Sequence, residues 1–131
     1  MTDSLDPARI VAEFLVSNLS ETLPPGLLLI SDSGADLVVK EGAEVTPCLD
    51  LALISNPENA DDFAGLIHVA LDSVQVAVSR ITRLPWPRVG ESLNVVDAYS
   101  IQVGRSISSG YGTADDPLLP LPPLPLPETL T

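Results

Sequence analysis

Proline clusters set the boundaries within which this chain can fold. Thirteen of its 131 residues are proline, and most of them stand at 24–25, 85–87 and 117–127. Proline fixes φ and lacks a backbone N–H, so a cluster ends any helix that reaches it and cannot supply hydrogen bonds to a central strand. Helices and central strands are therefore expected in the stretches between the clusters.

The stretch before the first cluster has the signals of a helix. Asp6 can accept hydrogen bonds from the first helical N–H groups, and Pro7 suits the first helical position because no donor is needed there. An apolar stripe at helical spacing follows, formed by Ile10, Val11, Phe14, Leu15 and Leu19. The sequence predicts a helix that ends before Pro24-Pro25-Gly26.

Three short strands are predicted after that loop. The apolar runs 27–30 and 37–39 flank the turn-forming sequence Ser31-Asp32-Ser33-Gly34, which favours a hairpin. An exposed loop is expected over 40–44. The third strand is expected over Cys48–Ile54, where alternating leucines would share one face: Leu49, Leu51 and Leu53.

The segment between residues 57 and 82 allows two interpretations. Asn56-Pro57-Glu58 is a helix start, and apolar residues then recur at helical spacing, which favours a helix over about 57–71 that can continue to 81. Alternating valines at 74, 76 and 78 are also typical of a strand, so 74–82 could instead pair into the sheet. Further along, Leu93–Ile107 is expected as the last strand and 108–112 as a flexible loop.

These elements predict an α+β domain over residues 1–112, in which a small, mostly antiparallel sheet of about four strands carries two helices on one face. Residues 113–131 would form an extended, proline-rich tail in the polyproline II conformation. Because its prolines cannot add a central strand and its leucines offer apolar area, the tail is expected to be an intermolecular arm. The contact residues would be Pro117, Leu119, Leu121, Leu124 and Leu126.

Charge excludes several classes of partner. The formal net charge is −12, and a nucleic-acid binder needs a basic stripe, so neither nucleic acid nor an anionic membrane is expected as a partner. Residues 1–72 hold thirteen acidic and two basic side chains, whereas residues 73–131 hold five acidic and four basic ones. This asymmetry is either a solubilising surface or two complementary faces that meet between copies. The less acidic face would carry Arg80, Arg83 and Arg88.

Few residues suggest chemistry. Trp86, between two prolines, would be either a plug in the core or an interface anchor. His68 is the only histidine and Cys48 the only cysteine, so no metal site, cofactor or disulfide is predicted. The N-terminus lacks the pattern of a secretory signal, and no run reaches about 20 apolar residues, which predicts a soluble protein made in the cytoplasm.

One short motif resembles that of an enzyme family. The run Leu28-Leu29-Ile30-Ser31-Asp32-Ser33-Gly34-Ala35 resembles the Asp-Ser/Thr-Gly-Ala signature of retroviral-type aspartic proteases. The resemblance implies a homodimer in which Asp32 is catalytic and Ser33 braces it, and it gives Ile101–Arg105 the place of a second family strand. The alternative is an ordinary β-turn, because Asp, Ser and Gly are turn formers.

The order of the expected elements is helix, three strands, helix and strand. This order resembles that of the tail-terminator and neck proteins of tailed bacteriophages, over residues 5–107. The resemblance implies a non-enzymatic virion component that forms homo-oligomeric rings and contacts other virion proteins through its tail. Such an assembly protein is the function expected here. The alternatives are the aspartic protease and a monomeric adaptor that uses its proline-rich tail, in which Pro117–Pro120 fits a PxxP motif.

Overall fold

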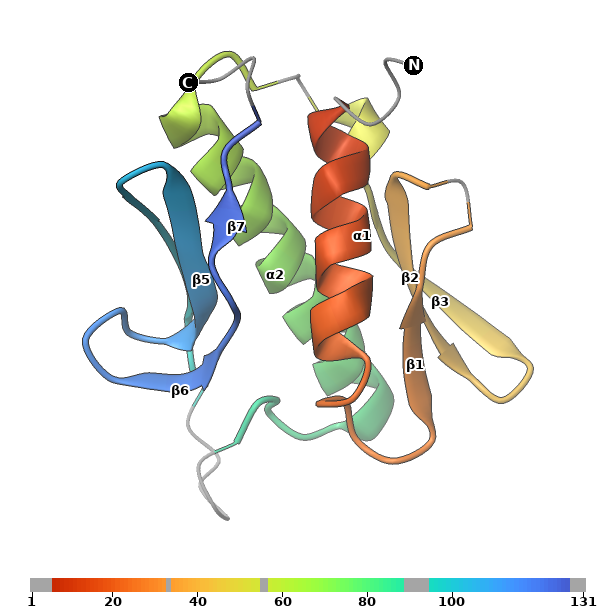
Figure 1. Cartoon of the computed structure of the whole chain (residues 1–131). Coiled ribbons are helices and arrows are strands. Elements are labelled where there is room, and N and C mark those ends of the chain that lie inside the picture. Colours follow the sequence, from red (N-terminus) through yellow and green to blue (C-terminus); the bar gives the residue numbers. More distant parts are fainter. Residues whose placement is uncertain (1–5, 33, 55–56, 89–94, 128–131) are drawn as a thin grey trace.

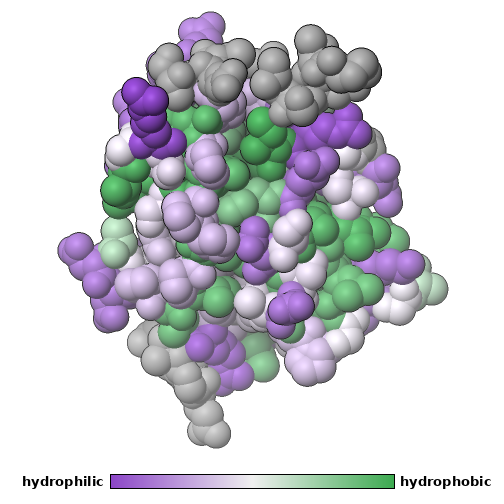
Figure 2. Space-filling model, in the orientation of Figure 1, coloured by the Kyte–Doolittle hydropathy of each residue, from purple (hydrophilic) through white to green (hydrophobic). Residues whose placement is uncertain are grey.

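A computed structural model describes residues 6–32, 34–54, 57–88 and 95–127. Two helices lie between two antiparallel sheets, one of three strands and one of four (Figure 1). The α+β class is therefore confirmed, but the single sheet with both helices on one face is wrong. On the side that carries the first helix, hydrophobic and hydrophilic residues alternate over short distances (Figure 2).

Helix α1 spans Pro7–Leu19, as its capping signals predict. The Asp6 side chain accepts a hydrogen bond from the Ala8 N–H at 3.1 Å, and Pro7 occupies the first turn. The predicted stripe is buried at Val11, Leu15 and Leu19. Local sequence signals are sufficient for this element because both the cap and the buried face lie within it.

The first sheet has the order β1-β2-β3, with β1 at Leu27–Ile30, β2 at Asp36–Glu41 and β3 at Glu44–Asp50. The predicted β1–β2 hairpin is confirmed. The expected loop over 40–44 is wrong, because both strands extend into it and the chain reverses at Gly42, which has a φ of 59°. Strand β3 therefore begins at Glu44, four residues before the expected start at Cys48.

The expected third strand over Cys48–Ile54 is also wrong in its second half. After Asp50 the chain enters a short 3₁₀ turn, η2, at Leu51–Leu53. The Asp50 side chain caps this turn by accepting the Ala52 N–H at 3.0 Å. Leu51 is buried and Leu53 is exposed, so these two leucines do not share one face of a strand.

Helix α2 spans Ala60–Thr82, and the strand alternative for 74–82 is wrong. The Asn59 side chain caps its start by accepting the Asp62 N–H at 2.9 Å. At its other end Arg83 has a φ of 62°, and its N–H donates to the Ser79 carbonyl. By length and composition alone α2 could cross a membrane, which is weak evidence because a core helix passes the same test.

The width of the apolar surface on α2 explains why there are two sheets. Its buried residues cover more than one side of the helix: Phe63, Ala64, Leu66, Ile67, Ala70, Leu71, Val74, Gln75, Ala77 and Val78. A helix that packs on one sheet buries a single stripe. A wider apolar surface needs further layers, and α2 has them in β3, β4 and α1.

The second sheet contains β4 at Ala98–Val103 and β5 at Ser106–Gly112. The single strand expected over 93–107 is wrong, since the chain reverses at Gly104-Arg105. Gly104 has a φ of 64°, and the first position of a two-residue type II′ hairpin turn favours glycine for this reason. The loop expected over 108–112 is likewise part of β5.

The proline-rich segment completes this second sheet. Its strands β6, Pro117–Pro120, and β7, Leu124–Pro125, both pair with β5. The Leu121 N–H donates to the Ser109 carbonyl at 2.9 Å, and the Leu126 N–H donates to the Arg105 carbonyl. This arrangement differs from the expected intermolecular arm, because residues 117–127 lie on their own domain.

Prolines and leucines have different roles in this segment. At an edge position a proline needs no hydrogen-bond donor on its solvent side, while most of the leucines turn inward. Leu121 belongs to the core, and further leucines pack against it: Leu119, Leu124 and Leu126. Close approach of the segment to β5 requires glycine at 110, because a Cβ there would clash with the Leu119 carbonyl.

This packing predicts different effects for two leucines of the same segment. Leu121 is 8% exposed and Leu118 is 38% exposed. Leu121→Ala should lower the free energy of unfolding by about 2–4 kcal/mol, because it leaves a cavity in the core. Leu118→Ala should change it by less than about 0.5 kcal/mol. Chemical denaturation of the monomer measures both, and equal, small effects would show that the segment does not contribute to the core.

Candidate protein-interaction site

Trp86 lies in the core, which favours the plug in the core over the interface anchor. Its ring meets that of Tyr111 edge to face, with centroids 5.2 Å apart and an angle of 70°. The Tyr111 hydroxyl donates to the Leu71 carbonyl at 2.6 Å, and burial raises the pKa of this phenol. The two rings thus join β5, α2 and the loop after α2.

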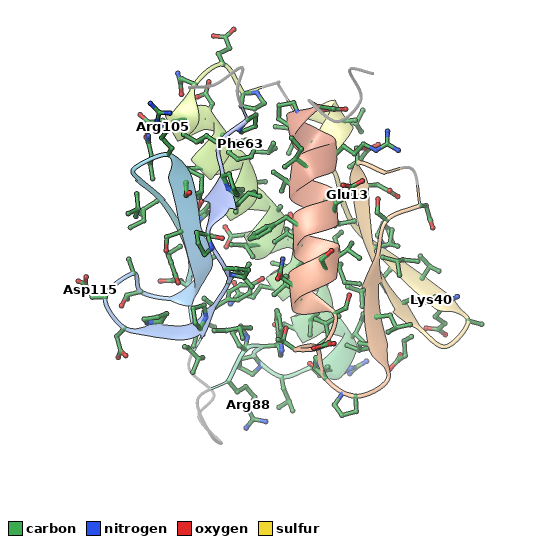
Figure 3. The ribbon with its side chains drawn as sticks, in the orientation of Figure 1. Glu13, Lys40, Phe63, Arg88, Arg105 and Asp115 are labelled. Atoms are coloured by element: carbon green, nitrogen blue, oxygen red, sulfur yellow. The ribbon has the colours of Figure 1, made fainter. Side chains whose placement is uncertain are left out.

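The three candidate arginines lie at the end of α2 and just beyond it. Arg80 is exposed in the last turn, Arg83 is the exposed C-cap, and Arg88 is half-buried. Arg88 appears at the lower edge of Figure 3, well away from Arg105 on the β4–β5 hairpin. The hypothesis that acidic and Arg-bearing faces meet between copies stays a prediction.

The Asp32 motif forms a turn between β1 and β2. The Ser31 hydroxyl donates to Asp36 Oδ1 at 3.1 Å and accepts the Gly34 N–H at 3.1 Å. Asp32 is exposed, and Ser33 lies outside the described residues. The hydrogen bonds around Asp32 are those of a local turn.

The histidine and the cysteine lie on or beside α2. His68 Nε2 is 3.5 Å from Asp72 Oδ2, and both side chains are about half exposed, as in a surface pair one helical turn apart. Burial raises the pKa of the Cys48 thiol to about 11. Within the described residues, no group of three His, Cys, Asp or Glu side chains could hold a metal ion.

Val69 and Val76 form an exposed stripe on α2, and a groove lies on each side of this stripe. One groove, of about 230 Å³, lies between this helix and β3 and is lined by Cys48, Asp72 and Arg80 among others. Another lies between the first half of α2 and β4, where Gly65 and His68 face Ser100 and Gln102. Between the grooves the stripe presents Val69 and Val76, both exposed. The outer side of α2 is therefore open between the edges of the two sheets.

Strand β4 forms one of these edges and presents apolar residues to solvent. Ile107 and Tyr111 of β5 are fully buried, so their partners Gln102 and Ala98 face the helices. The alternate residues of β4 point to the other face. Ile101 is 43% exposed and Val103 is 58% exposed, and Val95, just before the strand, is 72% exposed.

The other described sheet edges carry features that discourage pairing with another chain. Strand β3 contains Pro47 and an irregular register and is bounded by Glu44 and Asp50. Strand β1 has four residues, and its Leu29 carbonyl accepts a hydrogen bond from Ser20. The β6–β7 edge is rich in proline. Prolines, bulges, charges and short length are the means by which proteins block edge pairing.

Within its six residues, strand β4 has no proline, no charge and no register shift. Its sequence Ala-Tyr-Ser-Ile-Gln-Val contains no proline and no charge over six residues. Alternation along the strand expected over Leu93–Ile107 puts Tyr99, Ile101 and Val103 on one face, but alternation alone does not assign that face to solvent. The signal that could have done so is the Gly104-Arg105 turn followed by a second alternating run, which implies a hairpin with β4 on its outer side.

Comparison of the chain with family models, with curated proteins and with solved structures finds no match. The edge of β4 and the neighbouring stripe of α2 together present several exposed apolar side chains. These side chains lie next to strand backbone that pairs with no other strand on its outer side.

The raised pKa of Cys48 gives a prediction about its reactivity. The thiolate is the nucleophile, so alkylation by iodoacetamide at pH 8 should be about 100-fold slower than for an unperturbed thiol. The rate should keep rising to about pH 11 instead of levelling near 9. Stopped-flow or mass-spectrometric rates, with circular dichroism confirming the fold at each pH, measure this. The unfolded protein in guanidinium is the control, and a plateau near pH 9 in the folded protein would contradict the burial.

Proposed function

We propose that the protein is a non-enzymatic assembly protein that associates with copies of itself through the edge of β4. The observation that carries this proposal is the contrast between β4 and the other described edges. Three edges carry prolines, an irregular register, boundary charges or short length, whereas β4 is six residues long, uncharged and free of proline. An open edge of this kind is a template for pairing with another strand.

Side chains around the edge support the same proposal. Val95, Ile101 and Val103 are exposed on or beside β4, and Val69 and Val76 are exposed on the adjoining side of α2. Covering such side chains removes apolar area from water and contributes roughly 25 cal/mol per Å². Backbone pairing would supply orientation, and the valines and isoleucine would supply most of the affinity.

A narrower proposal is that the assembly is a ring in the tail or neck of a virion. It is supported by the order of elements, since α1, three strands, α2 and further strands follow one another in the chain. The described leucines of the C-terminal segment pack on their own domain. The pairwise contact between copies is therefore assigned to β4 in place of this segment. Pairing of one β4 with another joins only two copies, so a ring also needs a second contact between such pairs.

The proposal predicts that a charge on the open edge prevents association. Ile101→Lys should raise the dissociation constant at least about tenfold, because each pairing event would bury or crowd two like charges. Leu53→Lys is the matched control, since Leu53 is 84% exposed on η2, away from this edge. Sedimentation velocity over a range of protein concentrations measures both. A wild-type protein that stays monomeric throughout, or an Ile101→Lys variant that associates normally, would contradict the proposal.

Salt separates this proposal from the hypothesis of complementary charged faces. If the acidic and Arg-bearing faces meet between copies, added salt should weaken association, because exposed charges are screened beyond about 10 Å at 0.1 M salt. Strand β4 is uncharged, and each copy has a net charge of −12. Association through β4 should therefore strengthen as salt screens the repulsion between copies. Sedimentation at low and high ionic strength shows whether association weakens or strengthens as salt is added.

A further inference from the structure

We infer that β4 pairs antiparallel with β4 of a second copy about a two-fold axis that passes between the two Ile101 residues. This inference rests on the proposed function and adds the partner's orientation and register. In this register Asp97 lies opposite Arg105 of the partner subunit, and Tyr99 lies opposite Val103 of the partner subunit. The pairing would join the two four-stranded sheets into one continuous sheet.

Backbone directions limit which registers are possible. The Asp97 carbonyl accepts the Gly112 N–H at 2.8 Å, so the backbone groups of Asp97 face β5. Direction alternates along a strand, and the groups of Ala98, Ser100 and Gln102 therefore face away from β5. The Val96 carbonyl agrees with this pattern, because its hydrogen bond comes from the Gln75 side chain of α2 and not from β5.

Only registers that place these outward residues opposite one another can form the hydrogen bonds. Centring the pair on Ile101 sets Ser100 opposite Gln102 of the partner subunit, and the two-fold axis repeats this pair on the other side. Ile101 then occupies a non-hydrogen-bonded position, where opposite side chains approach most closely. The register thus provides backbone bonds on both sides of an apolar contact between the two isoleucines.

Charge selects this register among those that the backbone permits. Asp97 directly precedes β4, and Arg105 lies in the turn directly after it. Figure 3 shows Arg105 at the free end of the β4–β5 hairpin, where its side chain is accessible. A shift of two residues in either direction would set Asp97 opposite Val103 or Ile107 of the partner subunit. Centring on Ile101 therefore matches both charges of each copy with opposite charges.

The side chains along the seam suit this arrangement. Aromatic and β-branched residues form favourable cross-strand pairs, as Tyr99 would with Val103 of the partner subunit. No charged residue lies between Ala98 and Val103, so copies that each carry −12 meet without like charges along the paired strands. Grooves that α2 forms with β4 and with Val95 also bring the exposed side of α2 close to the seam.

Cysteine cross-linking tests the register in the full-length protein. Ile101→Cys in a Cys48→Ser background places two thiols across the axis at a Cα separation of about 4.5 Å, within the range of a disulfide. Val103→Cys in the same background is the matched control, because its copies would be four residues out of alignment, about 13 Å apart. Mild oxidation should convert Ile101→Cys to the covalent dimer at least about tenfold faster than Val103→Cys. A mixture of Tyr99→Cys and Val103→Cys should give the cross-linked heterodimer.

Charge reversal tests the two ends of the seam. Asp97→Arg or Arg105→Asp alone should weaken the dimer by about tenfold, because each creates two like-charged pairs. The double variant Asp97→Arg/Arg105→Asp should regain the wild-type affinity to within about threefold. Circular dichroism and thermal melting of each variant show whether the fold is kept.

These outcomes separate the register from the proposed function. Suppose that Ile101→Lys abolishes association, but Ile101→Cys cross-links no faster than Val103→Cys, or the double charge reversal fails to restore affinity. The two-fold register is then overturned, while association through β4 stands. A protein that is monomeric at every concentration overturns both. Preferential cross-linking at Ile101 together with recovery in the double variant supports the register.

Discussion

The burial of α2 on more than one side determines the rest of this structure. A helix with so wide an apolar surface is not covered by one sheet and one neighbouring helix. The two sheets meet this need from opposite sides, and the hydroxyl of Tyr111 fixes the second sheet to the helix through the Leu71 carbonyl. Trp86 then closes the end of this contact against the Tyr111 ring. Each sheet is small, so the shared helix is what makes them one fold.

Two sheets also create four edges, and these edges differ in whether another strand could pair with them. The same property of proline that excludes it from central strands makes it suitable at the outer side of β5, where β6 and β7 lie. Pro47 has a comparable effect in β3. Strand β4 keeps an unmodified edge beside an open side of α2. A chain that blocks most of its described edges and leaves one open concentrates its capacity for strand pairing at a single place.

Local signals in the sequence were sufficient for some elements only. Helix α1 and the β1–β2 hairpin were predictable because their caps, turns and apolar stripes lie within about ten residues. The region after Trp86 was not, since alternation gives the same pattern whether a face meets the core or solvent. Residue type allows Trp86 to be either a core plug or an interface anchor and favours Leu121 as a contact between copies, whereas both lie in the core. Residue type indicates that a side chain will be buried, but not against what.

The net charge of the chain favours self-association at the open edge of β4 over other parts of the surface. A chain with a net charge of −12 repels its own copies, and most of its acidic side chains lie before residue 73. Self-association is then least opposed where the local surface is neutral, and β4 provides six uncharged residues bounded by one acidic and one basic side chain. In an antiparallel pair these bounding charges fall opposite their complements. The rest of the surface stays acidic and disfavours other contacts between copies, so repulsion elsewhere increases the specificity of the one neutral seam.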